Sequence, residues 1–117
     1  HLDEFGDDKK DILKCLDYVF DPQRGGHVLL GIDKDEIVGA VIINETGMSG
    51  YIPENILVYI AVHRNYRGQR VGKELIKKAI NVTTGDIALH VEPNNPAKIL
   101  YEKLGFENKY LEMRLNR

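Results

Sequence analysis

The run from Ile56 to Val62, ILVYIAV, constrains the fold of this chain more than any other feature. Successive side chains of a β-strand point to opposite faces of its sheet, and here both sets are apolar or aromatic. Such a strand must be covered on both faces, and the run is too short to favour a buried helix. The run therefore predicts a central strand in a sheet with a layer of structure on each side.

The flanking elements supply those layers. Asp7 to Phe20 and Val71 to Val82 carry apolar residues at helical spacing, which predicts two amphipathic helices. Between them HVLLGI, the polar tip DKDE and IVGAVII predict a β-hairpin. GDIALHVE, after the second helix, predicts a fourth strand around Ile87 to Val91. The loop NETGMSGYIPEN precedes the central strand and is long enough to have a function.

The C-terminal part predicts one more helix and one more strand. PNNPAKILYEKLGF begins with Asn and Pro, as helix starts do, and stops at Gly105, as a helix-terminating glycine would. FENKYLEMRLN alternates weakly and is predicted as a last strand. The order of elements predicts a single α/β domain over residues 1–117 with a mixed sheet.

Composition narrows the function classes. The formal net charge is −2, so the overall charge gives no reason to expect nucleic-acid binding. No apolar run approaches the roughly 20 residues that cross a bilayer, and no signal peptide is recognisable. Cys15 is the only cysteine, which fits a reducing compartment. A cytoplasmic protein without a membrane partner or a metal site is expected.

Positive charge is concentrated in VHRNYRGQRVGKEL, between the central strand and the second helix. Three arginines, at positions 64, 67 and 70, surround a glycine-bearing turn that opens a helix. Backbone N–H groups and the positive end of the helix dipole form an anion site there. The alternative is a βα turn with solvated arginines. A nucleotide P-loop is excluded, because Glu74 follows Lys73 where a magnesium-binding Ser or Thr is required.

These residues carry a family resemblance. VHRNYRGQRVGKEL resembles the acetyl-CoA loop of the GNAT N-acetyltransferase superfamily, Arg/Gln-x-x-Gly-x-Gly/Ala after a strand. Further along, NNPAKILYEKLGF is similar to the family's Asn-x-x-Ala-x-x-Leu-Tyr-x-Lys-x-Gly-Phe segment. The matching residues of that segment are Asn94, Ala97, Leu100, Tyr101, Lys103, Gly105 and Phe106. The hairpin also resembles the family's usual strand pair, and the likeness covers roughly residues 7–117.

The resemblance implies a mixed, mostly antiparallel central sheet flanked by helices, with a splayed central strand pair that holds acetyl-CoA. By position, backbone groups of Ile60, Ala61 and Val62 would bind the pantetheine. Asn94 would cap the last helix or contact the same arm, with Asn95 as the alternative. The pyrophosphate would lie on the N–H groups of Arg67, Gly68, Gln69, Arg70, Val71, Gly72 and Lys73.

The chain departs from the family pattern in two places. Arg70 stands where the family usually has its first motif glycine. A side chain is acceptable there if φ is negative, and it would then either contact a CoA phosphate or crowd the pyrophosphate. Members of the family usually begin with a strand and a helix that find little room in HLDEFG, so a short or truncated amino end is expected.

The resemblance also implies catalytic roles. Tyr101 would be the general acid, because a phenol is protonated at neutral pH and can donate to a departing thiolate. The alternative is a core tyrosine. His90 occupies a position that is Glu in some relatives, and histidine changes protonation state near neutral pH. Glu92, Tyr59 or water are the other candidates for the general base.

The sequence therefore predicts an N-acetyltransferase that moves an acetyl group from acetyl-CoA to a primary amine of a small molecule or peptide. Transfer would be direct, in a ternary complex. The acceptor is expected near NETGMSGYIPEN and the first helix. The alternative is a non-catalytic CoA- or acyl-CoA-binding module that serves as a sensor or interaction domain. A monomer or a homodimer is expected.

Overall fold

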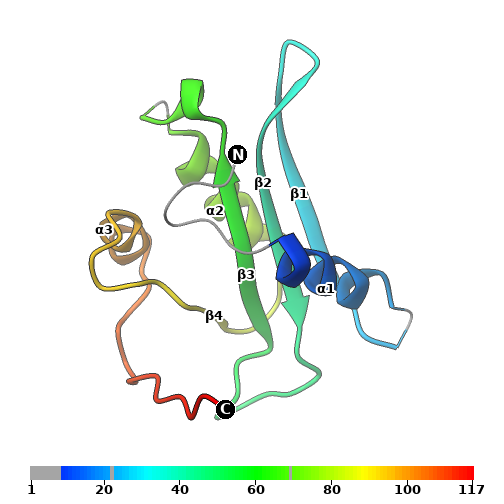
Figure 1. The fold of residues 1–117 in the computed structure, drawn as a ribbon, viewed down its shortest axis with the longest axis vertical. Helices are drawn as coiled ribbons and strands as arrows, with labels where there is room; N and C mark the ends of the chain where they lie inside the picture. Colours follow the sequence, from blue (N-terminus) through cyan, green and yellow to red (C-terminus); the bar gives the residue numbers. More distant parts are fainter. Residues whose placement is uncertain (1–8, 22, 69) are drawn as a thin grey trace.

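The computed structural model describes residues 9–21, 23–68 and 70–117. Gln69 of the predicted phosphate loop and the first two residues of the predicted N-terminal helix lie outside these ranges. The elements are, in order, α1 (Lys9–Phe20), β1 (Gly26–Asp33), β2 (Glu36–Glu45), β3 (Asn55–Val62), the 3-10 turn η1 (Arg64–Tyr66), α2 (Val71–Val82), β4 (Ile87–Leu89) and α3 (Ala97–Lys103) (Figure 1).

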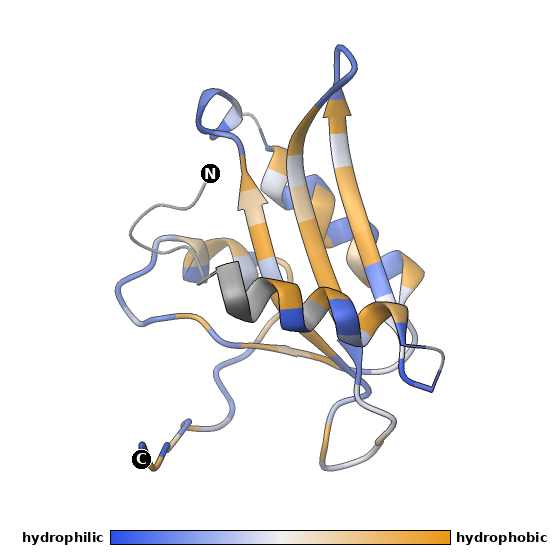
Figure 2. Cartoon of the chain, turned by 45° about the vertical axis from the view of Figure 1, so that its right-hand side comes forward, coloured by the Kyte–Doolittle hydropathy of each residue, from blue (hydrophilic) through white to orange (hydrophobic). Residues whose placement is uncertain are grey.

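The four strands form one sheet in the order β1-β2-β3-β4. The first three strands pair antiparallel, and β4 pairs parallel to β3 because the crossover through α2 returns the chain in the same direction. The central position that its two-sided apolar pattern predicts for β3 is confirmed. Figure 2 shows the apolar strands between α1, which crosses one face, and α2, which lies behind the other.

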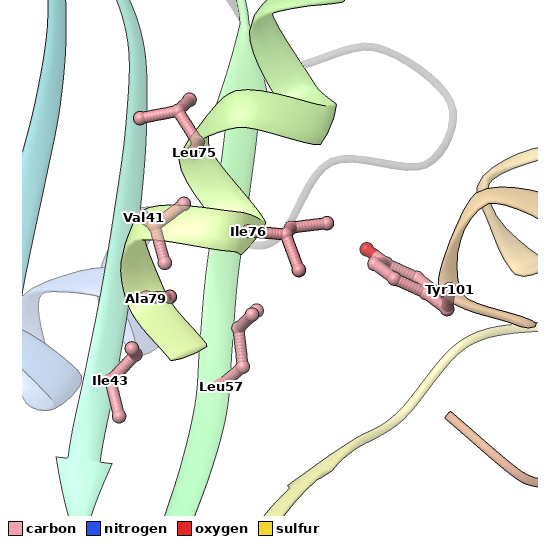
Figure 3. Close-up of a cluster of buried hydrophobic side chains, with 7 residues drawn as sticks. All are labelled: Val41, Ile43, Leu57, Leu75, Ile76, Ala79 and Tyr101. Atoms are coloured by element: carbon pink, nitrogen blue, oxygen red, sulfur yellow. The ribbon is translucent and has the colours of Figure 1, made fainter. Parts of the chain in front are cut away.

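The core lies between α2 and the sheet. Ile76 and Ala79 of α2 are fully buried against Val41 and Ile43 of β2. Glycine at position 39 allows this close approach, because a β-carbon there would lie 2.8 Å from Leu75 Cδ1. The buried cluster, drawn in Figure 3, consists of Val41, Ile43, Leu57, Leu75, Ile76, Ala79 and Tyr101.

Strands β3 and β4 are paired only at one end. Asn55, Ile56 and Leu57 pair with Ile87, Ala88 and Leu89. On the other side of β3, Ile42 pairs with Tyr59 and Ile43 with Leu57, which leaves Val58 as an extra residue, a β-bulge. A bulge bends its strand and increases its twist. Since the β3–β4 ladder stops at the bulge, the predicted splayed strand pair is confirmed, as is the mixed, mostly antiparallel sheet flanked by helices.

Side-chain hydrogen bonds hold the closed end of this pair. Asn55 is 2% exposed, and its Nδ2 donates to the carbonyl oxygens of Thr84 at 2.8 Å and Asp86 at 3.2 Å. Glu54 Oε1 accepts the backbone N–H of Asp86 at 3.3 Å. These bonds fix the chain that enters β4 against the start of β3, so the two strands meet here and separate further along.

Two predictions about the strands are wrong. β4 ends at Leu89, so His90 and Glu92 follow the strand instead of belonging to it, because β3 has bent away and offers no partner. FENKYLEMRLN forms no strand in the part of the chain that the structure describes. Its weak alternation does not bring it to a sheet edge, and after Phe106 its large apolar side chains Tyr110, Leu111, Met113 and Leu115 are exposed.

Candidate functional site

The open edge of β3 presents backbone groups to the space left by β4. The N–H of His63 donates to Val38 O at 2.6 Å and so points toward β2. Backbone groups alternate in direction along a strand, so those of Ile60 and Val62 point away from β2 and those of Ala61 toward it. The Val62 carbonyl accepts from Arg67 Nε at 3.3 Å, in agreement with this direction. Of the three residues predicted to bind pantetheine, Ile60 and Val62 therefore face the gap with their backbone.

The start of α2 adjoins the end of this edge. The first N–H to reach an acceptor within the helix belongs to Glu74, which donates to Arg70 O at 3.0 Å. The first N–H groups of a helix lack an intrahelical acceptor, here those of Val71, Gly72 and Lys73, and the side chain of the N-cap residue Arg70 makes no capping hydrogen bond. These donors lie at the positive end of the helix dipole, which favours an anion. Gly68 turns the chain toward them with a φ of +82°.

Arg70 adopts the left-handed conformation, with φ 69° and ψ 12°, at the N-cap position of α2. The negative φ that would make a side chain readily acceptable here is not found, because the turn into α2 places a left-handed residue immediately before the helix. This conformation costs a residue with a β-carbon about 1–2 kcal/mol. The Arg70 side chain is exposed, and among the described residues it forms no ion pair. The loop therefore keeps a free positive charge on a strained backbone.

Tyr101 enters the core from α3, and Figure 3 shows its hydroxyl directed toward Ile76. The residue is 6% exposed, and its ring packs edge-on against Phe106 with centroids 5.8 Å apart. Within the described ranges the hydroxyl has no hydrogen-bond partner. Burial raises the pKa of Tyr101, so the hydroxyl keeps its proton throughout the neutral range. Tyr101 is thus a core residue that also carries an available proton donor.

The candidate bases Tyr59 and His90 lie outside the buried cluster that contains Tyr101. Ile87, Leu89 and Val91 pack against the buried cluster, whereas His90, which follows β4, is not part of it. His90 is exposed. Tyr59 pairs with Ile42, and paired residues share a face of the sheet. Since Ile42 lies outside the cluster, the half-buried Tyr59 is on the face opposite Tyr101. Tyr101 and Tyr59 therefore lie on opposite faces of the sheet.

The asparagines before α3 have different environments. Asn95 Oδ1 accepts the backbone N–H of Ala97 at 2.9 Å and so starts the helix, whereas Asn94 is exposed. The helix ends at Lys103, and the predicted terminating glycine, Gly105, follows the C-cap residue with a φ of +103°. The bulge at Val58 and the buried Asn55 were not predicted. An apolar strand residue gives no sequence signal for a bulge, and a lone Asn at a strand start is unremarkable.

A polar depression of about 440 Å³ lies at the hairpin tip, away from the gap, and is lined by Asp33, Lys34, Glu36, His63, Asn65 and Tyr66. The Tyr66 hydroxyl donates to Asp33 Oδ2 at 2.8 Å. This hydrogen bond, then burial and nearby carboxylates, raises the pKa of Tyr66. The contact ties η1 to the hairpin, and so fixes the chain that leads from β3 into α2.

The sequence matches the Acetyltransferase (GNAT) domain over residues 24–108. This chain belongs to the GNAT acetyltransferase family. Members of the family use acetyl-CoA. Across the described residues no helix is long and apolar enough to cross a membrane, and no three His, Cys, Asp or Glu side chains are grouped as metal ligands.

Several known proteins are similar to this GNAT chain. N-alpha-acetyltransferase 30 of Schizosaccharomyces pombe is 29% identical over 82 residues, and the match covers 66% of this chain but 55% of that protein. A transcriptional regulator from Bacillus halodurans C-125 superimposes with a TM-score of 0.70 at 19% identity, covering 92% of this chain and 75% of the other. An aminoglycoside N-acetyltransferase in complex with CoA gives a TM-score of 0.67 at 16% identity, covering 93% and 87%. These structures share the fold.

Proposed function

We propose that this GNAT domain is an acetyl-CoA-dependent N-acetyltransferase that acetylates a primary amine of a small molecule or peptide by direct transfer. The observation that carries the proposal is the gap that opens at Val58 and leads along β3 to the uncapped start of α2. A strand edge and a helix N-terminus in line suit a ligand that is an amide-bearing arm joined to a phosphate group. Membership of a family that uses acetyl-CoA supports the same ligand.

The cofactor is held by backbone groups and local charge. The N–H groups of Val71, Gly72 and Lys73 bind the pyrophosphate, and the Arg67–Arg70 turn adds positive charge. Ile60 and Val62 hydrogen-bond the pantetheine arm through the open edge of β3. Ala61 lines the strand between them. Asn95 is engaged at the helix start, which leaves the exposed Asn94 as the residue that contacts the arm.

The proposed chemistry uses both sides of the gap. Bound acetyl-CoA supplies the acetyl group, whose C–S bond breaks as a C–N bond forms to the acceptor amine. Tyr101 donates its proton to the leaving sulfur, and burial suits this role because it keeps the hydroxyl protonated. His90, with Tyr59, Glu92 or water as alternatives, accepts the proton that the amine loses. A backbone N–H beside the bulge stabilises the charge that develops on the carbonyl oxygen.

The acceptor approaches from the α1 face, where Tyr59 lies. Asn44 Oδ1, a buried oxygen in β2 on this face, has no hydrogen-bond partner among the described residues. Buried acceptors normally have a partner, and an N–H of the acceptor molecule would supply one. The resemblance to N-alpha-acetyltransferase 30 supports a peptide α-amine. The resemblance to an aminoglycoside N-acetyltransferase keeps small polyamines among the candidate acceptors.

The test is CoA release from acetyl-CoA with a panel of peptide α-amines, lysine-bearing peptides and aminoglycosides, run beside a calorimetric titration with CoA. We expect binding and turnover with at least one amine class. Binding without turnover on any amine would favour the non-catalytic CoA-binding module. Absence of CoA binding would refute both functions.

Tyr101→Phe then tests the mechanism. The ring and its packing against Phe106 are retained and only the hydroxyl is lost, so we expect kcat to fall by about 10²–10⁴-fold. CoA affinity should change little, because a neutral hydrogen bond contributes only about 0.5–1.5 kcal/mol. Tyr110→Phe is the matched control, since Tyr110 is 62% exposed and lies in the C-terminal region. A wild-type kcat for Tyr101→Phe in single-turnover measurements would remove Tyr101 from the mechanism.

A further inference from the structure

The C-terminal segment, defined as residues 110–116, exposes a row of large apolar side chains. Leu111 is 87% exposed, Met113 91% and Leu115 79%. They alternate with Glu112 and Arg114, the pattern of a strand with one apolar and one charged face. Figure 1 shows this segment at the end of the chain, apart from the sheet. Large apolar side chains gathered on a surface mark a site of interaction.

The segment adjoins a second exposed apolar group. The ring of Tyr110 lies 5.8 Å, centroid to centroid, from the ring of Tyr51 in the loop between β2 and β3. In that loop Tyr51 is 80% exposed and Met48 is 58% exposed. The two groups together offer more apolar surface than the segment alone. Upstream, Phe106 packs against Tyr101, so the segment begins from a fixed point on the core.

The sequence of the segment is complementary to itself. In LEMRL, a two-fold axis at Met113 sets Leu111 opposite Leu115 of a second, antiparallel copy. The same register sets Glu112 opposite the partner's Arg114, on the other face. Opposite charges and paired apolar side chains both stabilise neighbouring strands. A two-fold interface requires this kind of self-complementarity.

The charges also limit the register. Beyond the segment, the same axis would set Lys109 opposite the partner's Arg117, which is repulsive, so the ladder ends at residues 110–116. A slip of the register by one residue would set apolar side chains opposite charged ones, and moving the axis to Glu112 or Arg114 would set that charge opposite its own copy. Within one chain Glu112 and Arg114 already contact each other, with side chains 45% and 63% exposed. The cross-strand contacts extend this pair into a group of four alternating charges.

We propose that the protein forms a two-fold dimer through antiparallel pairing of residues 110–116 with the same segment of a second copy. The partner is a second copy because the apolar pattern is symmetric about Met113 while the charges on its two sides have opposite signs, so an antiparallel copy matches both. The segment lies outside residues 24–108, which match the GNAT domain, so the dimer does not depend on the proposed enzymatic function. In the paired strands the apolar side chains of the two copies lie side by side on one face, and Tyr51 and Met48 of the loop between β2 and β3 add further apolar surface.

Analytical ultracentrifugation of the full chain over a concentration series tests this pairing. Wild type should shift from monomer to dimer. Glu112→Arg and Arg114→Glu each set like charges opposite each other twice per dimer, so each should weaken dimerisation about tenfold or more. An equimolar mixture of these two variants should dimerise, because each restores opposite charges to the other. The variant that carries both substitutions should also dimerise.

A wild type that stays monomeric into the high-micromolar range would overturn the proposal. So would single variants that dimerise as wild type does, or a mixture that stays monomeric. Disulfide trapping in a Cys15→Ser background tests the register independently. Met113→Cys should form a covalent dimer under mild oxidation, because the axis sets position 113 opposite itself. Glu112→Cys should not, because its two copies lie diagonally, outside disulfide geometry. Equal cross-linking of the two variants would refute the register.

Discussion

Replacing Arg70 separates the cost of its backbone conformation from the value of its charge. Arg70→Gly removes both the side chain and the restriction on φ, whereas Arg70→Ala removes the side chain and keeps the β-carbon at a φ of 69°. Both variants lose the same guanidinium from an exposed position. Their difference in stability therefore reports the left-handed conformation, and their shared change in CoA affinity reports the charge.

The expected magnitude follows from two opposing effects. The left-handed conformation costs alanine about 1–2 kcal/mol relative to glycine in the folded state. Glycine loses more backbone entropy on folding, which costs it about 0.5–1 kcal/mol. We expect Arg70→Gly to be more stable than Arg70→Ala by about 0.5–1 kcal/mol, measured as the free energy of unfolding in urea. At an m-value of about 1–2 kcal/mol per molar, the midpoints differ by roughly half a molar.

Affinity for CoA then decides between phosphate contact and crowding. If Arg70 donates to a phosphate, both variants bind CoA more weakly, by about tenfold, the low end of a charge-assisted bond for an exposed side chain. If Arg70 crowds the pyrophosphate, both variants bind more tightly. We expect weaker binding, and a rise in affinity for both would refute the contact. An alanine variant as stable as the glycine variant would refute the left-handed backbone.

Three further predictions concern stability. Gly39→Ala should lower the free energy of unfolding in urea by about 1–3 kcal/mol, because its β-carbon would lie 2.8 Å from Leu75 Cδ1. Gly31→Ala, at the paired position, is the control: its β-carbon would meet nothing closer than 3.6 Å, so it should be tolerated. Asn55→Ala should cost about 1–3 kcal/mol in thermal unfolding, because two carbonyl groups lose their donor; an unchanged Tm would contradict this. Burial raises the pKa of Tyr101, so the unfolded chain loses this proton at a lower pH than the folded chain does. The free energy of unfolding is therefore unaffected below the unfolded pKa of about 10 and falls as pH rises from there through the folded pKa. Wild type should therefore lose stability more steeply than Tyr101→Phe above about pH 10, and parallel curves would refute the shift.

Much of the fold was predictable because local patterns and tertiary packing agree. The helix Val71–Val82 has the predicted bounds, since its apolar spacing matches the face that packs on the sheet. The central strand begins one residue earlier than predicted, at Asn55, because a buried polar residue at a strand start looks like part of a loop. The positive loop was predicted to adjoin a helix start, and its N–H groups do lack intrahelical partners.

The remaining features depend on geometry that residue types do not encode. Arginine rarely adopts the left-handed conformation, so the residue type does not indicate that Arg70 does, and the sequence signal is its place at the family's usual glycine. Val58 is an ordinary strand residue, and only the pairing register reveals it as the bulge. The shortened β4 follows from that bulge, which ends the ladder before His90. The predicted last strand has the alternation of a strand, but whether it pairs depends on a partner that one chain does not provide.

The bulge at Val58 makes the opening in the sheet a matter of chain length more than of side-chain chemistry. The extra residue is accommodated by the main chain, so many apolar residue types at this position would leave β3 turned away from β4. Deleting the residue, in contrast, would let the parallel ladder continue and close the space with hydrogen bonds between strands. The protein therefore forgoes several backbone pairings that its own sheet could form. A single additional peptide unit keeps them available for a bound molecule.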